Sequence, residues 1–325
     1  MLLLQGYQII TRQCKPRALG RKYLPSNERL HFYASKSLGG TPLLVDDDVE
    51  QGVLTLTLNR PRQRHALNRV LLNELHTILQ EVKQRQQDGD RSIRAILLQS
   101  NGPVFCAGHD LKELSLLSQA EHCDLFQMCA SVMTLLTTLP QPTICAVQGL
   151  ATAAGCQLAA SCDLVVASRS RASFCTPGAA TLGFFCHSPA VPLVQSIGYK
   201  RSLDMLYTGR LVSANEAYQW GLVTRLVDDD DHVQEHETEG TDIDSNSFSL
   251  IHSTSLALAK EIAGHSAPAI QAGKQTVQLL HEAPTLEIAY QHASQAMVDN
   301  LQHGDAQEGI RCFIQKKKVP EWNHE

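Results

Sequence analysis

The chain has 325 residues, 43% of them hydrophobic and 19% charged, which is the composition of a globular protein with a substantial core. No run of about 18 apolar residues occurs, so we expect no membrane span. We also expect no nucleic-acid partner, and the net charge of −5 conceals a basic and an acidic segment. The ten cysteines are scattered, mostly inside apolar stretches, and form no CxxC pair. We therefore expect reduced core cysteines, with neither a disulfide framework nor a metal site.

The N-terminus is basic. Residues 1–40 carry seven Lys and Arg against one acid, Glu28, and begin with the apolar MLLL. A basic, acid-poor start with apolar residues between the charges is typical of a mitochondrial transit peptide, so we expect a mitochondrial protein. The alternative is a disordered basic tail.

Apolar runs alternate with helical patterns along the next part of the chain. Asn68 is a candidate N-cap of a helix whose apolar residues recur at helical spacing, and a second helix is expected at about 119–138. Strands that alternate with helices predict an α/β domain with a largely buried sheet. The expected strands are 53–59, 95–100, 143–147 and 164–167.

An acidic segment separates this part from a helical C-terminal region. Residues 228–244 contain nine acids and no Lys or Arg, so we expect a solvated, disordered loop, with a calcium site as the alternative. Beyond it, apolar residues share two broad helix faces, which predicts packing against another element or another subunit. The expected division is a core at 45–227, an acidic insertion at 228–249 and a helical oligomerisation region at 250–325.

Two loops combine glycine with small residues directly after a strand. They are FCAGHD, residues 105–110, and QGLATAAGC, residues 148–156. Peptide N–H groups at a helix start lack internal partners and attract a carbonyl oxygen or an oxyanion. Two such groups on one oxygen would form an oxyanion hole, in which one donor is worth about 3 kcal/mol. Taken alone, each loop is more commonly explained by close helix packing.

Five segments in chain order resemble the signatures of the crotonase superfamily, the enoyl-CoA hydratase/isomerase fold, over about residues 50–320. They are NRPRQRHAL, SNGPVFCAGHDLKEL, AVQGLATAAGCQLAASCDLVVAS, GYKRSLDMLYTGRLVSANEAYQWGLVTRLV and EGIRCFIQKKK. The resemblance implies an α/β crotonase-like spiral of ββα repeats with a C-terminal helical trimerisation region, in a homotrimer or hexamer. It implies an acyl-CoA thioester ligand, with coenzyme A as part of the ligand and no tightly bound cofactor, in mitochondrial fatty acid metabolism.

The resemblance also implies which residues contact the ligand. The two oxyanion donors are the backbone N–H groups of His109 and Ala154. A solvated basic tail is the alternative for the lysines near the C-terminus. The remaining implied contacts are Arg62 and Arg64 on the phosphate side, Ala107 and Leu111 at the adenine, and Lys316, Lys317 and Lys318 at the phosphates, sometimes across a subunit boundary.

The sequence departs from the hydratase pattern at both catalytic carboxylates. Family hydratases use two glutamates to activate water and to protonate the α-carbon; the matching positions here are Gln157 and Gly178. An amide does not exchange a proton near neutral pH and glycine has no side chain, so ordinary hydratase activity should be lost. We expect the Gln157 amide to be buried and satisfied by hydrogen bonds within the protein, with a bound substrate or water as the alternative partner.

Other residues could replace the missing acid and base. His109 is the first candidate because its unperturbed pKa lies near neutrality, although it could equally cap the loop or contact coenzyme A. Further candidates are Asp110, His187, Ser188 and Asp163, the last expected to hold a turn together. Two hypotheses follow: a non-catalytic acyl-CoA-binding protein, or an enzyme that relies on the oxyanion hole alone, such as a decarboxylase, thioesterase or isomerase.

Overall fold

The computed structural model describes residues 40–229 and 245–324. The expected transit peptide and most of the acidic segment lie outside these ranges. Among the described residues, no helix is both long and apolar enough to cross a membrane.

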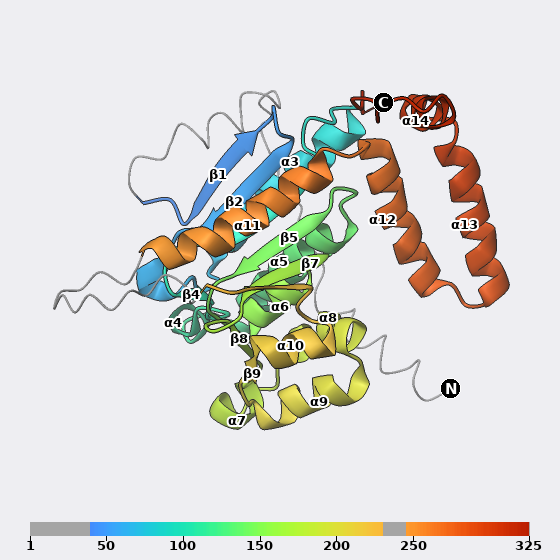
Figure 1. Cartoon of the computed structure of the whole chain (residues 1–325). Coiled ribbons are helices and arrows are strands. Elements are labelled where there is room, and N and C mark those ends of the chain that lie inside the picture. Colours follow the sequence, from blue (N-terminus) through green and yellow to red (C-terminus); the bar gives the residue numbers. More distant parts are fainter. Residues whose placement is uncertain (1–39, 230–244, 325) are drawn as a thin grey trace.

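A mixed sheet of six strands forms the centre of the protein (Figure 1). Its first strand pairs antiparallel with the second, and all other pairs are parallel. Every residue of the TICAV strand is buried, as expected of a strand covered on both faces. In spatial order the strands are β1 (Leu43–Asp48), β2 (Val53–Leu58), β3 (Ala95–Ser100), β5 (Thr143–Val147), β7 (Leu164–Ser168) and β10 (Arg225–Val227).

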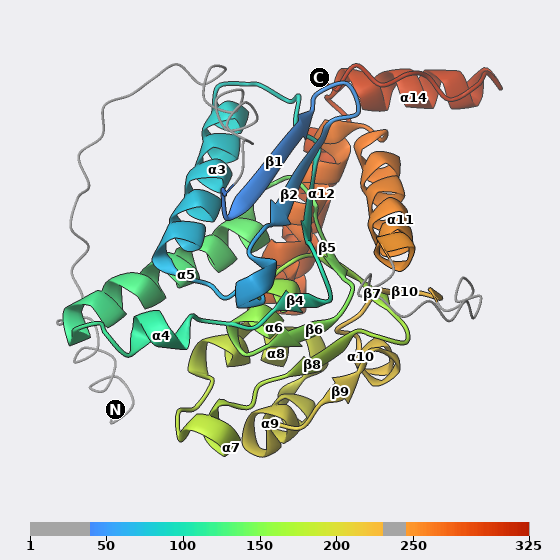
Figure 2. The same cartoon turned by 90° about the vertical axis from the view of Figure 1, so that its left-hand side faces the viewer.

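Helices cover both faces of this sheet. Helix α11 (Ser245–Ala263) crosses one face, where Ile251 and Leu258 pack against strand residues such as Ile144. Helices α3 (Arg69–Gln87) and α5 (Gln119–Thr138) pack on the other face and enclose the larger apolar core (Figure 2). The predicted cap is confirmed, because the Asn68 Oδ1 accepts a hydrogen bond from the Leu71 N–H at 3.0 Å.

A second, smaller sheet supplies the second strand of each ββα repeat. Its order is β4 (Val104–Cys106), β6 (Leu150–Thr152), β8 (Ser173–Cys175) and β9 (Val212–Ser213). Strands β3, β5 and β7 of the large sheet are each followed by a strand of the small sheet and then by a helix. This succession of ββα units confirms the expected α/β spiral.

Five further helices follow strands β6, β8 and β9 along the chain. They pack around the small sheet in the lower part of Figure 1. Their ranges are α6 (Ala154–Ala160), α7 (Gly178–Leu182), α8 (His187–Ile197), α9 (Tyr199–Thr208) and α10 (Ala214–Trp220).

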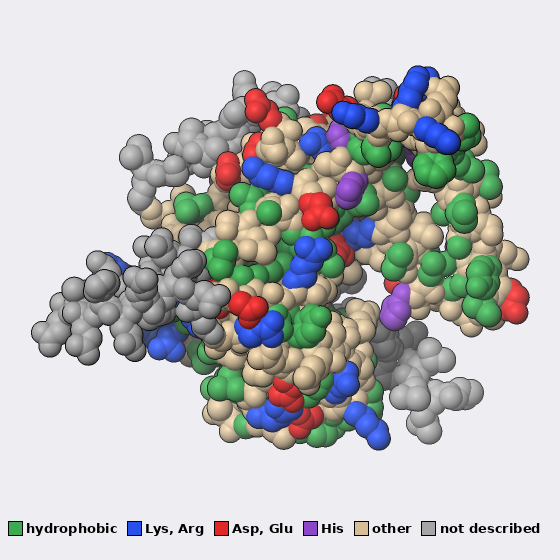
Figure 3. Space-filling view, in the orientation of Figure 1, with side chains coloured by type: hydrophobic (Ala, Val, Ile, Leu, Met, Phe, Trp, Pro, Cys, Tyr) green, Lys and Arg blue, Asp and Glu red, His purple; other side chains and the backbone are tan. Residues whose placement is uncertain are grey.

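The C-terminal helices extend away from the sheets. Helix α12 (Ala267–Glu282) and α13 (Leu286–Asn300) form a hairpin, followed by α14 (Gly304–Ile314) (Figure 1). Helix α13 buries no residue in the single chain, and green apolar side chains are visible along it in Figure 3. Tyr290 is 67% exposed and Met297 70%.

The expected limits of the acidic insertion, 228–249, are too wide at both ends. Asp229 is buried, where its carboxylate pairs with Arg171 and accepts a 2.9 Å hydrogen bond from the Ser168 hydroxyl. At the other end, α11 already begins at Ser245. The core likewise starts at Leu43 rather than at residue 45, because β1 pairs along its whole length with β2.

Candidate functional site

The two glycine-containing loops meet in the structure. Gly108 has a positive φ of 81°, and a Cβ built on it would lie 3.0 Å from the Ala153 Cβ and 3.1 Å from the Ala154 nitrogen. Only glycine combines this backbone conformation with such close contact. The backbone that leads into His109 therefore lies against the first residue of α6.

The start of α6 presents backbone N–H groups. The first hydrogen bond within the helix runs from the Gln157 N–H to the Ala153 carbonyl at 3.0 Å, and no side chain caps the helix. The N–H of Ala154 thus has no partner of the helical kind. Ala153 itself has a positive φ of 51°, which is rare for a residue with a side chain and is typical of functional sites.

The neighbouring loop is oriented by an isolated parallel bridge to Leu67. The Leu67 N–H donates to the Gly108 carbonyl at 2.7 Å, and the Asp110 N–H donates to the Leu67 carbonyl at 3.1 Å. In this pattern the residue between the two partners points its own N–H to the other side. The His109 N–H is therefore directed away from Leu67.

The His109 side chain packs against aromatic side chains that the sequence analysis did not identify as its neighbours. Its ring meets the Phe126 ring of α5 edge-on at 5.2 Å, and Phe126 stacks on Phe184 at 6.3 Å. Burial lowers the pKa of His109, against an opposite effect of the Leu67 backbone, so the ring is neutral at pH 7. Its Nδ1 is buried and has no hydrogen-bond partner among the described residues.

Gln157 differs from our expectation. Its side chain is 3% exposed, as predicted, but its Oε1 has no hydrogen-bond partner within the described ranges. The prediction of an amide satisfied within the protein is therefore wrong for this oxygen. The first turn of α6 offers this oxygen no hydroxyl or amide side chain, since besides Gln157 it contains only Ala154, Gly155 and Cys156. A buried acceptor without a donor costs free energy, which a bound ligand or water would recover.

Gly178, which the resemblance matches to the second hydratase glutamate, has no room for a side chain. A Cβ built on it would lie 2.2 Å from the Phe184 carbonyl oxygen and 2.8 Å from the Cys186 sulfur. The Phe184 N–H also donates to the Gly178 carbonyl at 3.1 Å, which holds the two segments together. No signal in the sequence indicates this, because the contacts come from residues six and eight positions further on.

The residues expected on the coenzyme A side lie beside the same loops. Arg62 and Arg64 are exposed in and after the short 3-10 helix η1 (Pro61–Gln63), and Arg62 lines a surface cavity of about 470 Å³. The Ala107 N–H donates to the Arg64 carbonyl at 2.9 Å, which joins the first two sequence motifs. Leu111 is 53% exposed at the start of α4 (Leu111–Leu114).

The C-terminal lysines are not part of this group in the single chain. Lys316 and Lys317 are exposed directly after α14. Figures 1 and 2 both place α14 at the end of the molecule opposite α4. Within one chain, the structure therefore does not bring these lysines to the two loops.

Of the remaining candidates, Asp110 and Asp163 make structural contacts, and His187 and Ser188 are exposed. Asp110 caps α4 and pairs with Arg60 at 3.4 Å. The Asp163 carboxylate accepts from the Thr143 N–H at 2.7 Å and pairs with Lys274 at 2.7 Å, so it ties the start of β5 and helix α12 together rather than closing the local turn that we expected. His187 and Ser188 are exposed at the start of α8.

Comparison with known proteins identifies the family. Residues 48–248 match the model described as enoyl-CoA hydratase/isomerase. The chain belongs to the enoyl-CoA hydratase/isomerase family. It is 40% identical to the rat protein named enoyl-CoA hydratase domain-containing protein 3, mitochondrial, over 87% of this chain and 85% of the relative. For the human protein of the same name the identity is 38%, over 84% and 82%.

Solved structures of the enoyl-CoA hydratase/isomerase family agree with this assignment. The crystal structure of human enoyl Coenzyme A hydratase domain-containing protein 3 is 36% identical and superimposes with a TM-score of 0.73, over 86% of this chain and 99% of that one. An enoyl-CoA hydratase from Mycobacterium smegmatis is 36% identical with a TM-score of 0.75, over 87% and 99%. The resemblance drawn from the five sequence segments is confirmed, and so is the fold class.

Proposed function

We propose that this family member binds an acyl-CoA thioester in mitochondria but has lost ordinary enoyl-CoA hydratase activity. In this proposal the thioester carbonyl accepts hydrogen bonds from the N–H groups of His109 and Ala154. The contact between Gly108 and the start of α6 supports this arrangement, because it holds the two backbone segments side by side. The names of the rat and human relatives and the basic N-terminus support the mitochondrial location.

The packing around Gly178 supports the proposed loss of hydratase activity. Hydration needs groups that move protons at the water and at the α-carbon. Gln157 cannot do so, and the contacts of Gly178 with Phe184 and Cys186 leave no volume for a carboxylate. The unpaired Gln157 oxygen can instead accept a hydrogen bond from a ligand or a water molecule.

Two calorimetric titrations test binding separately from turnover. Butyryl-CoA, which has no double bond to hydrate, should bind saturably to the purified protein. A protein that binds neither butyryl-CoA nor crotonyl-CoA would contradict the proposal. Free coenzyme A serves as the reference: it has no thioester carbonyl for the oxyanion donors to hold, so it should bind more weakly.

A second candidate is an enzyme that uses the oxyanion hole alone, such as a decarboxylase, thioesterase or isomerase. One observation favours it: the neutral His109 ring keeps a buried Nδ1 without a partner, so it could accept a proton. Turnover of malonyl-type, 3-enoyl and saturated CoA esters tests this candidate. A His109→Ala variant that still binds butyryl-CoA and loses a detected activity would support it, and unchanged turnover would exclude the ring from the reaction.

We also propose that the protein assembles as a trimer or hexamer through its C-terminal helices. The exposed apolar side chains of α13 support this, because such a stripe is expected to be covered. Assembly could bring the lysines after α14 of one subunit toward the site of another. Sedimentation equilibrium measures the state, and a monomer at all accessible concentrations would contradict the proposal.

A further inference from the structure

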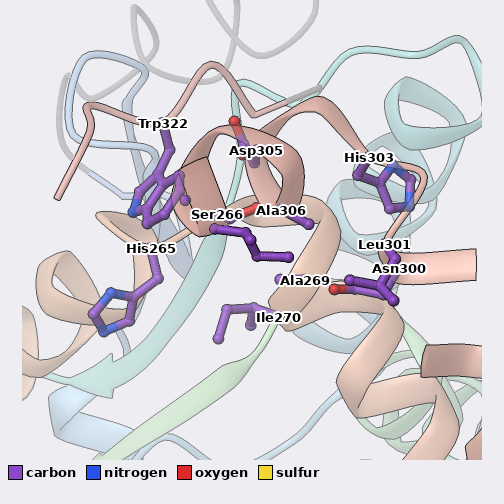
Figure 4. A pocket seen from close by; sticks show the side chains of 12 residues that line it. His265, Ser266, Ala269, Ile270, Asn300, Leu301, His303, Asp305, Ala306 and Trp322 are labelled. Atoms are coloured by element: carbon purple, nitrogen blue, oxygen red, sulfur yellow. The ribbon is translucent and has the colours of Figure 1, made fainter. Parts of the chain in front are cut away.

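A cavity of about 440 Å³ lies within the C-terminal region, away from the two loops of the candidate active site. The beginnings of α12 and α14, the end of α13 and the C-terminal tail surround it. Figure 4 shows Trp322 and His265 on one side and Leu301 and His303 on the other. Its size is in the range of small-molecule sites.

Asp305 is the one acidic residue among those that line this cavity, and its carboxylate is only half satisfied. The side chain is 4% exposed. Its Oδ1 accepts a 3.0 Å hydrogen bond from the Asn323 N–H of the tail. Its Oδ2 is buried and has no hydrogen-bond partner within the described residues. A buried carboxylate oxygen without a donor is costly, so a donor at this position would bind favourably.

The negative charge of Asp305 also lacks a cationic partner. No Lys or Arg lines the cavity, and no ion pair of Asp305 occurs in the described part of the chain. Burial lowers the pKa of the nearby His324, as does the charge of Arg94, while Asp305 acts in the opposite direction. His324 is therefore neutral at pH 7, and its Nδ1 accepts from the Ala267 N–H at 3.3 Å.

The rest of the lining is suited to an apolar body beside a positive charge. The Trp322 indole is held against α14, since a Cβ on Gly309 would lie 3.1 Å from the ring. An indole face attracts a nearby cation. Ile270, Leu301 and Ala306 add apolar surface.

We propose that this cavity binds a small organic cation, a primary ammonium group on a short apolar chain. The ammonium group donates to the Oδ2 of Asp305, and the chain lies against Trp322 and Ile270. The cavity is thus a second binding site, with a ligand chemistry opposite to that of the phosphate-bearing coenzyme A. It does not depend on the function proposed for the first site.

The fluorescence of Trp322 reports on the cavity directly. The chain has two tryptophans, so a Trp220→Phe background isolates the signal. In this background, hexylammonium chloride should change the emission saturably and bind at least tenfold more tightly than hexan-1-ol, and sodium hexanoate should bind more weakly still. Equal binding of the three probes, or none, would overturn the proposal.

Two matched substitutions test whether the carboxylate of Asp305 binds the ammonium group. Asp305→Asn keeps an acceptor for the Asn323 N–H and removes the negative charge, so hexylammonium should bind at least tenfold more weakly and hexan-1-ol should be unaffected. Asp299→Asn removes an exposed charge from the end of the adjacent helix and should change neither. Unchanged hexylammonium binding in Asp305→Asn would refute the site. If that variant fails to fold, as circular dichroism would show, the comparison of the three probes on the background protein decides alone.

Discussion

The sulfur of Cys186 lies 2.8 Å from the point at which a side chain on Gly178 would begin. A real Cβ does not approach a sulfur this closely, and the Phe184 carbonyl oxygen is closer still, at 2.2 Å. The position that the sequence resemblance matches to a hydratase glutamate is therefore filled by a neighbouring segment. On the proposed function, a single substitution at Gly178 therefore cannot supply this carboxylate without displacing the neighbouring segment.

We expect Gly178→Glu to destabilise the protein by more than about 2 kcal/mol, because overpacking a filled site forces backbone and side chains apart. Gln157→Glu combined with Gly178→Glu should not produce hydratase activity. Urea unfolding and a crotonyl-CoA assay measure the two effects. Gly273→Glu is the control: a Cβ there meets nothing within 4 Å, so the same substitution should leave stability unchanged or raise it.

Gly108→Ala should weaken butyryl-CoA binding by about tenfold or more, because the added methyl group would press on Ala153 and Ala154. Its positive φ adds a conformational cost of about 1–2 kcal/mol. Gly102→Ala is the control. Its φ of 75° gives a similar conformational cost, but the added Cβ would lie 3.5 Å from its nearest neighbour, the Pro61 Cβ. Calorimetry should show weakened binding in the first variant alone; equal loss in both would mean that contact with α6 is irrelevant.

The burial of His109 predicts a dependence of stability on pH. Burial lowers the pKa of this imidazole in the folded protein, so the unfolded chain binds the proton more readily. The free energy of unfolding should therefore fall as the pH drops below the unfolded pKa of about 6.5. His65 and His252, whose pKa values burial also lowers, contribute in the same direction.

Substitution isolates the contribution of His109. The fall in stability between pH 7 and pH 5 should be smaller in His109→Gln than in the unaltered protein. His187→Gln, at an exposed position, should leave the fall unchanged. Identical pH profiles for all three proteins would show that the His109 ring is not desolvated.

Arg171→Ala should destabilise the protein by about 1–3 kcal/mol, because among the described residues it leaves the buried Asp229 carboxylate with hydroxyl donors only. Burial alone would raise the pKa of Asp229, but hydrogen bonds from Ser168 and Arg171 lower it. Arg169→Ala, which removes a pair with the exposed Asp228, should cost about 0–1 kcal/mol. Urea unfolding of both variants at pH 7 provides the measurement, and equal losses would contradict the difference in burial.

The sequence predicts the large sheet well, for physical reasons. Strands such as β5 are buried on both faces and appear as short apolar runs, and the cap at Asn68 is a local signal. Strands β4, β6 and β8 have three residues each, too few to show a period. Strand β1 gives no clear strand signal, because three of its six residues are aspartates, which are more common in loops.

The sequence predicts the features of the site that depend on the local backbone conformation. It does not predict those that depend on side chains packed from distant segments. The glycine in FCAGHD and the small residues after QGL indicated that two loops would bare their N–H groups, and the structure brings Gly108 and Ala154 together. The aromatic neighbour of His109 comes from the middle of α5, where Phe126 looks like any helical residue. The unpaired oxygen of Gln157 depends on what neighbouring elements fail to supply, which no local pattern encodes.

Hydration of crotonyl-CoA in water labelled with oxygen-18 tests the central claim most directly. The protein is mixed with crotonyl-CoA at a concentration shown to saturate it, and the labelled 3-hydroxyacyl product is quantified by mass spectrometry. A hydratase that has both glutamates is assayed in parallel as the reference. Each missing acid or base is worth about 10² to 10⁴ in rate, so the account predicts a rate at least about 10⁴-fold below that of the reference. A rate within a hundredfold of the reference would contradict it.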